Sequence, residues 1–151
     1  MDQQVQQDNA TSRQRLRQLV ACLNEEDFSR QVNEDWTIAA TLAHLAFWDQ
    51  SCVARWDAFD RNGSFVSLSD ATVELINAAS LPAWLAIPGR SAAELVLRAA
   101  EDADGRTERL SATALAYVVE HDRAFILDRA SHRTPHLDEI EQILDSSSMP
   151  K

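Results

Sequence analysis

The stretch TIAATLAHLAFWDQSCVARWDAFDRNG, from Thr37 to Gly63, decides the fold class of this sequence. Its apolar residues recur at steps of three and four: Ile38, Leu42, Leu45, Trp48, Cys52, Trp56 and Phe59. This spacing places them on one face of a helix with 3.6 residues per turn. Asp35 or Thr37 can cap its start, and Asn62-Gly63 ends it. The stretch therefore predicts a long helix with one buried face.

Helices are also expected on both sides of this central one. Residues of about 12–27 form the first, which Thr11 or Ser12 can cap. Its buried face carries Leu16, Leu19, Val20 and Leu23. After the central helix, Ser69 caps a shorter helix that Pro82 stops. The chain then passes through a connection that contains Trp84, Pro88 and Gly89.

Three more helices are expected in the second half of the chain. Ser91 starts a long helix, weakened at Gly105, whose buried side carries Ala92, Leu95, Val96, Ala99, Ala103 and Leu110. Ser111 caps another stretch, with Leu115, Val118, Val119 and Phe125 as its apolar stripe. A terminal helix of about 134–145 buries Leu137, Ile140, Ile143 and Leu144. The sequence thus predicts one all-α helical-bundle domain over residues 1–151, with flexible tails at about 1–10 and 146–151.

The composition agrees with a small number of long helices. Three Gly and four Pro in 151 residues are about 5%, against an average usage of about 12%. A β-sandwich or barrel needs many turns, and turns use Gly and Pro. The absence of strand alternation and of any domain linker points the same way.

The charge balance excludes several classes of partner. Fourteen basic and 24 acidic residues give a formal net charge of −10, without a basic stripe, so nucleic acid is not an expected partner. No membrane association is expected either, because the longest apolar stretch, Ile38 to Trp48, is too short to span a bilayer. The N-terminal sequence lacks the pattern of a signal peptide. Cys22 and Cys52 fall in apolar patterns and are interpreted as reduced core residues of a cytoplasmic protein.

Three of the four histidines are candidates for chemistry. His44 lies at the edge of the buried face of the central helix, where it can face a cleft or simply bond to a neighbouring carbonyl. His132 and His136 form an H-x-x-x-H pair, which on a helix places two imidazoles about 6 Å apart along one face. Pro135 must lie in the first turn of the terminal helix. With Thr134 as the cap, His132 is then expected just outside regular helix.

Other polar residues are assigned mainly to structure. His121 lies off the apolar stripe of its segment and is expected to be solvated, with a role as substitute ligand as the alternative. Asp122 falls inside that stripe, and is either a buried acceptor, for instance for Arg129, or a sign that the helix breaks. Neither cysteine has the basic surroundings that activate a thiol nucleophile.

Two segments together resemble a known group of proteins. DWTIAATLAHLAFWD, from Asp35 to Asp49, and HRTPHLDEI, from His132 to Ile140, resemble the DinB-like superfamily. That group includes maleylpyruvate isomerase N-terminal domains, thiol S-transferases and ClbS-type resistance proteins. The resemblance covers most of the chain and implies an up-and-down four-helix bundle with a long crossover that carries short extra helices. It also implies a divalent metal held by His44, His132 and His136.

The resemblance implies a function as well. The expected function is a metal-dependent enzyme acting on a small molecule by thiol transfer or addition, isomerisation or hydrolysis. Zinc or nickel, with iron or manganese as alternatives, is the expected metal, and a low-molecular-weight thiol is a candidate co-substrate. Trp48, Asn77 and Trp84 are expected to line the pocket, and the acid–base residue is not assigned. The alternatives are a non-catalytic small-ligand-binding bundle with a degenerate site and a structural partner protein; a homodimer is also expected.

Overall fold

The computed structural model describes residues 3–121 and 123–148, and these are almost entirely helical. The elements are α1 (Gln3–Cys22), η1 (Asp27–Ser29), α2 (Ile38–Asn62), α3 (Asp70–Leu85), α4 (Gly89–Glu108), α5 (Ala112–Glu120), η2 (Ala124–Leu127) and α6 (Ala130–Ser148). The described residues contain no strand; one isolated bridge joins Gln31 and Thr37. The all-α prediction is confirmed.

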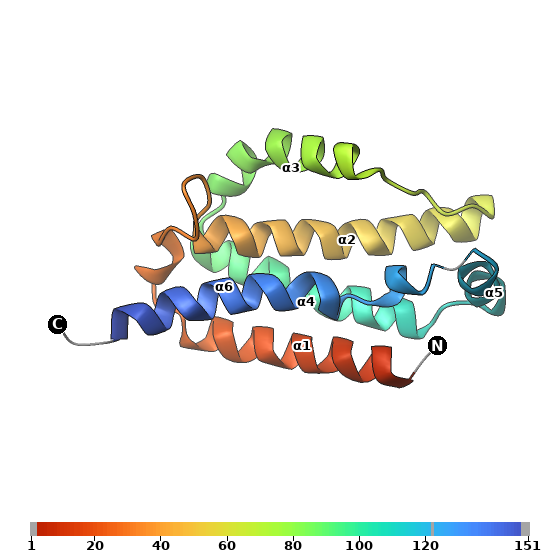
Figure 1. Ribbon diagram of the computed structural model, residues 1–151, viewed down its shortest axis with the longest axis horizontal. Coiled ribbons are helices and arrows are strands. Elements are labelled where there is room, and N and C mark those ends of the chain that lie inside the picture. The colour runs from red at the N-terminus through yellow and green to blue at the C-terminus, as the bar shows by residue number, and fades with distance from the viewer. Residues whose placement is uncertain (1–2, 122, 149–151) are drawn as a thin grey trace.

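The long helices α1, α2, α4 and α6 lie side by side, and α3 runs back along α2 outside them (Figure 1). Because α3 returns the chain to the end where α2 began, α2 and α4 run in the same direction, and α1 and α6 run the opposite way. This is the four-helix bundle with a long crossover that the sequence predicts. The short helix α5 closes one end of the bundle (Figure 1).

The central helix is confirmed at both ends. The Thr37 hydroxyl accepts a hydrogen bond from the Ala40 amide, at 3.2 Å, so Thr37 is the cap. At the other end, Gly63 adopts φ 71°, a left-handed conformation that glycine reaches without strain from a Cβ. The Gly63 amide donates to the Phe59 carbonyl. Local sequence signals therefore fix both boundaries of α2.

The first helix begins earlier and ends earlier than the sequence predicts. α1 starts at Gln3, so Thr11 and Ser12 lie inside it and are not caps. Their hydroxyls donate to the carbonyls of Gln7 and Asn9 within the same helix. Residues 3–10, expected as a tail, form the first turns. α1 ends at Cys22 instead of near residue 27, and Cys22 is exposed, which corrects its placement in the core.

The start of α6 is fixed by a contact from α1. The Asn9 side-chain oxygen accepts hydrogen bonds from the amides of Arg129 and Ala130, at 2.8 and 2.9 Å. The Ser131 amide donates to Asp128 Oδ1, at 2.9 Å. These bonds satisfy amides that the first turn of a helix leaves without an internal acceptor. The helix therefore begins at Ala130, ahead of the predicted position 134.

This earlier start changes the setting of the histidine pair. Thr134 is not a cap, and His132 lies inside α6, one turn before His136. Pro135 lies beyond the first turn of the helix, contrary to the prediction, and it lacks the N–H that would pair with the carbonyl four residues earlier. Helix continues past it through residues 146–148, which were expected to be a tail. Residues 149–151 of that predicted tail lie outside the described residues.

The crossover also differs from the prediction. α3 continues through Pro82 to Leu85, so Trp84 is helical and buried and does not lie in a connection. Pro82 removes the hydrogen bond that its own amide would donate, but it does not stop the helix. α4 begins at Gly89 directly after Pro88, ahead of the predicted Ser91.

Two residues that the sequence predicts to be buried are exposed, and the predicted cap of α5 is confirmed. Leu95 on α4 and Val119 on α5 are exposed, at 39% and 80%, although both were predicted to be buried. The Ser111 hydroxyl accepts from the Ala114 amide, which confirms the cap of α5. That helix ends at Glu120. Asp122, for which the sequence left two interpretations open, lies outside the described residues.

The buried apolar residues form two clusters. The larger joins α1, α2, α4 and α6 with Phe28 and Trp84, and alanines line the contact between α2 and α4. These alanines are Ala39, Ala40, Ala43, Ala46, Ala92, Ala93, Ala99 and Ala100. Small side chains let the two helices pack closely. The smaller cluster lies toward α5 and includes Cys52, Trp56, Phe59, Phe65, Leu110 and Val118.

Two glycines of α4 offer a matched test of this packing. A Cβ on Gly89 would lie 2.3 Å from Cγ of the Phe28 ring, whereas one on Gly105 would meet only the end of the Arg109 side chain, at 3.1 Å. We expect Gly89→Ala to lower the free energy of unfolding by about 1–3 kcal/mol. Gly105→Ala should leave it unchanged or raise it by up to about 1 kcal/mol, because alanine favours helix. Urea denaturation of both variants measures this, and equal midpoints would contradict it.

Among the described residues, no helix combines the length and the apolar character that a transmembrane span requires.

Candidate metal centre

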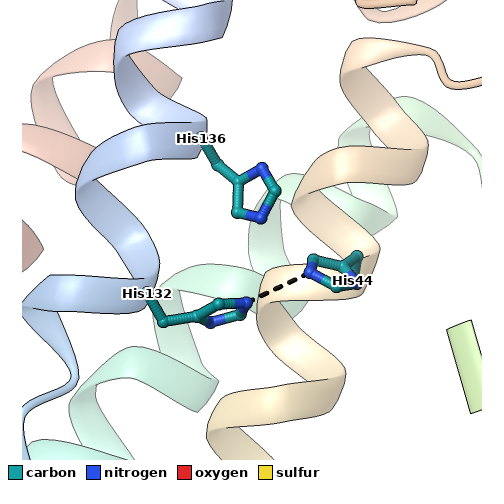
Figure 2. Close-up of side chains that lie close together, drawn as sticks. All are labelled: His44, His132 and His136. Carbon is teal, nitrogen blue, oxygen red and sulfur yellow. Dashed lines mark hydrogen bonds between the residues drawn. The ribbon is translucent and has the colours of Figure 1, made fainter. Parts of the chain in front are cut away.

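Three histidine side chains from two helices converge between α2 and α6. His44 comes from α2, and His132 and His136 come from α6 (Figure 2). The Nε2 atoms of His44 and His132 lie 3.1 Å apart and share a hydrogen bond. One nitrogen of each of the three rings lies within 4.8 Å of the other two. The structure thus brings together the three residues that the sequence singled out, in a group that could hold a metal ion.

Two of the rings are held in the neutral form. Burial, with a smaller contribution from the nearby His136, lowers the pKa of His44 to about 3. Burial also lowers the pKa of His132 to about 2, with the positive charge of Arg129 acting in the same direction. Both imidazoles are therefore neutral near pH 7. The neutral ring is the form that offers a nitrogen lone pair to a metal.

The three rings are oriented in different ways. His136 Nδ1 donates to Glu139 Oε2, at 3.2 Å, which leaves its Nε2 with a free lone pair. His44 is held by packing, because Trp36 and Trp84 both meet its ring edge-on with centroids 5.1 Å away. Nδ1 of His44 is buried and has no hydrogen-bond partner among the described residues, and the same is true of His132. Aromatic contacts therefore fix His44, and a carboxylate fixes His136.

A cleft of about 600 Å³ opens beside the three histidines. Trp36, Trp48 and Asn77 are among the residues that line it. Trp48 Nε1 donates to Asn77 Oδ1, at 2.9 Å, which ties α2 to the crossover helix α3. Trp84 is not among the lining residues; it packs behind His44 and belongs to the larger core cluster. The structure thus places two of the three predicted pocket residues at the cleft and Trp84 behind it.

The remaining candidates lie away from this site. His121 is exposed on α5's C-terminal side, stacks on Tyr117 with centroids 4.1 Å apart, and is not a member of the three-histidine group. Cys52 is buried, and burial raises the pKa of its thiol. A protonated, buried thiol does not serve as a nucleophile. These positions agree with the structural interpretation of both residues.

The sequence interpretation missed a buried ionic network next to the histidines. Arg133 is fully buried and donates to Asp49 at 2.9 Å and to Asp104 at 2.9 Å. Arg129 donates to the other oxygen of Asp49 at 2.9 Å, and Arg13 pairs with Asp104 at 3.2 Å. The network joins α1, α2, α4 and the start of α6. Along α2 and α4 it lies between the two apolar clusters.

One signal for this network was present in the sequence. Asp49 lies four residues after Leu45 and three before Cys52, which is an apolar position of the central stripe. A carboxylate at such a position must be paired in the fold. Its partners, Arg129 and Arg133, are far away in sequence, so only the fold identifies them.

The comparison with known families agrees with the fold and the site. The sequence model of the DinB superfamily matches residues 9–140. The match spans both segments that carry the histidines. This chain belongs to the DinB superfamily. No significant match was found among the curated proteins or among the solved structures.

Proposed function

We propose that this protein is a divalent-metal-dependent enzyme that acts on a small molecule, with His44, His132 and His136 as the metal ligands. The observation that carries the proposal is the convergence of three ring nitrogens within 4.8 Å at the edge of a cleft. Buried histidines that are neutral and face one another are the donor set that zinc, nickel and iron sites use.

The spacing of the nitrogens supports this assignment. Two nitrogens bound to one metal at about 2.1 Å lie about 3.0 Å apart at a right angle and about 3.4 Å apart at the tetrahedral angle. The Nε2 atoms of His44 and His132 are 3.1 Å apart. The side chain of His136 is 26% exposed, so a small rotation can bring its nitrogen closer. The residues present therefore fit a metal.

The chain's own residues prepare the site for chemistry. The three histidines occupy one side, so the opposite side faces the cleft with Trp36 and Trp48 in its wall. These indole rings give the cleft an apolar wall beside the histidines. When bound, the metal supplies a Lewis acid that lowers the pKa of a water or a thiol toward neutrality.

The finer parts of the proposal follow from the family resemblance. We propose thiol transfer or addition, isomerisation or hydrolysis as the reaction, with a low-molecular-weight thiol as candidate co-substrate. Zinc or nickel is the proposed metal, with iron or manganese as alternatives. We further propose a cytoplasmic location, which the free thiols of Cys22 and Cys52 support, and a homodimer, which follows from the family resemblance alone. Light scattering after gel filtration tests the dimer.

Cobalt substitution tests whether a thiol reaches this site. We expect untagged protein loaded with Co²⁺ to show visible ligand-field absorption, and we expect 2-mercaptoethanol to add a thiolate-to-cobalt band in the near ultraviolet. His136→Ala should lose both signals, whereas His121→Ala should keep them. A cobalt spectrum that no thiol or substrate analogue alters would favour the alternative, a non-catalytic binding bundle.

A further inference from the structure

Two arginines lie in the same cleft as the histidines. Arg55 and Arg129 both line it. Arg55 follows His44 by about three turns along α2, and Arg129 precedes His132 by about one turn. Because α2 and α6 run in opposite directions, both arginines lie on the side of the histidines that faces α5 (Figure 1). The cleft therefore has the imidazoles at one end and the guanidinium groups at the end nearer α5.

Arg129 has a donor that nothing in the described part of the chain accepts. Its Nε donates to Asp49 Oδ1, at 2.9 Å, and its side chain is only 13% exposed. Its Nη2 is buried without a hydrogen-bond partner. A buried donor without a hydrogen-bond partner lowers the stability of the fold, and the loss is larger when the donor belongs to a charged group. An acceptor supplied by a ligand in the cleft would remove this cost.

Arg55 likewise has no carboxylate partner among the described residues. Its Nε donates to the Val66 carbonyl at 2.9 Å, and its guanidinium lies over the Phe65 ring, 4.5 Å from the centroid. Burial lowers the pKa of Arg55, and the positive charges of Arg129 and Arg123 lower it as well. The two cleft arginines thus repel each other.

The cleft is lined by three acids and two arginines, and none of these acids forms an ion pair with Arg55 or Arg129 in the described part of the chain. In the buried network, Arg13, Arg129 and Arg133 face two carboxylates, Asp49 and Asp104. The three acids of the cleft are Asp70, Asp128 and Glu139. Asp128 accepts from the Ser131 amide, and Glu139 accepts from His136. Asp128 and Glu139 therefore engage other groups.

We propose that Arg55 and Arg129 form a binding site for the carboxylate group of a small organic acid. Both arginines have their Nε engaged. Arg129 has an unpartnered Nη2, and the guanidinium of Arg55 lies over the Phe65 ring, so we expect one carboxylate in the cleft to accept from both side chains. A doubly charged phosphate would suffer greater repulsion from the cleft acids than a singly charged carboxylate would. Carboxylate binding is independent of any metal. Only its role in orienting the rest of the molecule toward the histidines rests on the proposed function.

The test uses metal-free protein, so that it does not depend on the histidines. Protein treated with EDTA is titrated with sodium propionate at constant ionic strength, and the Trp48 indole resonance is followed by NMR. We expect a saturable shift with propionate and none with the neutral isostere propionamide. Arg55→Gln should weaken binding by about tenfold or more, the value of a charged hydrogen bond. Arg61→Gln, at an exposed position of the same helix, should change nothing.

Several outcomes would overturn this inference. Equal binding by wild type and Arg55→Gln, equal shifts with propionate and propionamide, or no saturable shift at all would each reject the site. The carboxylate assignment would be rejected if inorganic phosphate bound more tightly than propionate and lost affinity in the Arg55→Gln variant. Arg129→Gln should also lose about tenfold, but because Arg129 supports Asp49, Arg55→Gln is the deciding variant.

A parallel metal titration separates this inference from the proposed function. If the Arg55→Gln variant loses propionate binding but takes up metal as the wild type does, both the carboxylate site and the metal site are supported. Propionate binding in a protein that holds no metal would leave the carboxylate site intact and contradict the proposed function. Metal uptake without propionate binding would contradict the carboxylate site alone.

Discussion

Asp49→Ala is expected to lower the free energy of unfolding by about 3–5 kcal/mol, the largest effect on stability that we predict. Asp49 is fully buried and accepts hydrogen bonds from both Arg129 and Arg133, each at 2.9 Å. Its removal leaves Arg133, also fully buried, with Asp104 as its remaining carboxylate partner. A total stability of about 5–15 kcal/mol is typical of such a domain, so this loss is a large fraction of the whole.

The same helix provides the matched control for this prediction. Asp57 also forms an ion pair, with Arg106 at 2.9 Å, but it is half exposed. Asp57→Ala should therefore cost no more than about 1 kcal/mol. Urea denaturation followed by circular dichroism compares the two variants. If both lost the same small amount of stability, the network would not hold the helices together as the structure indicates.

His44→Ala is expected to reduce the affinity for a divalent metal by at least about a hundredfold, the largest effect on function that we predict. Loss of a group that only supports a metal ligand lowers the metal affinity by about 10–100-fold, and loss of the ligand itself should lower it at least as much. His136→Ala should give the same result. His136 is partly exposed, so this variant is less prone to disturb the core than His44→Ala, whose site is 4% exposed.

The control for metal binding is the histidine outside the group. His121 is exposed and stacks on Tyr117, so His121→Ala should bind metal as wild type does. Competition with a chromophoric chelator measures the dissociation constants of untagged proteins. Equal losses in all three variants, or no loss in His136→Ala, would contradict the assignment of the ligands.

The sequence predicts most of the fold because the decisive signals are local. The stripe of α2 and its caps at Thr37 and Gly63 lie within one segment and need no knowledge of the remaining chain. The same holds for the caps Ser69 and Ser111. Exposed apolar residues such as Val119 break the pattern, since a short helix at the end of a bundle buries only a narrow face.

The parts that could not be predicted depend on contacts between distant segments. The first turn of α6 is capped by Asn9, which lies about 120 residues earlier in the chain. No local rule locates such a partner, so the helix start was placed too late and His132 was placed outside it. With the helix start at Ala130, the histidine pair lies on continuous helix although Pro135 is between its members.

The site itself was predictable only in part. The three histidines were identified from their spacing together with the family resemblance. The arginines of the cleft were not, because a guanidinium is usually solvated and only packing shows that Arg129 has a buried, unpartnered nitrogen. The unpartnered nitrogen of Arg129 is thus a property of the fold, and a net charge of −10 gives no sign of it.

The metal content of the untagged wild-type protein tests the central claim most directly. After incubation with excess Zn²⁺ or Ni²⁺ and removal of free metal, plasma mass spectrometry gives the number of ions per chain. We predict about one ion per chain, because the three histidines form a single site. A protein that is folded by circular dichroism but retains less than about a tenth of an ion per chain, with any divalent metal tried, would contradict the account.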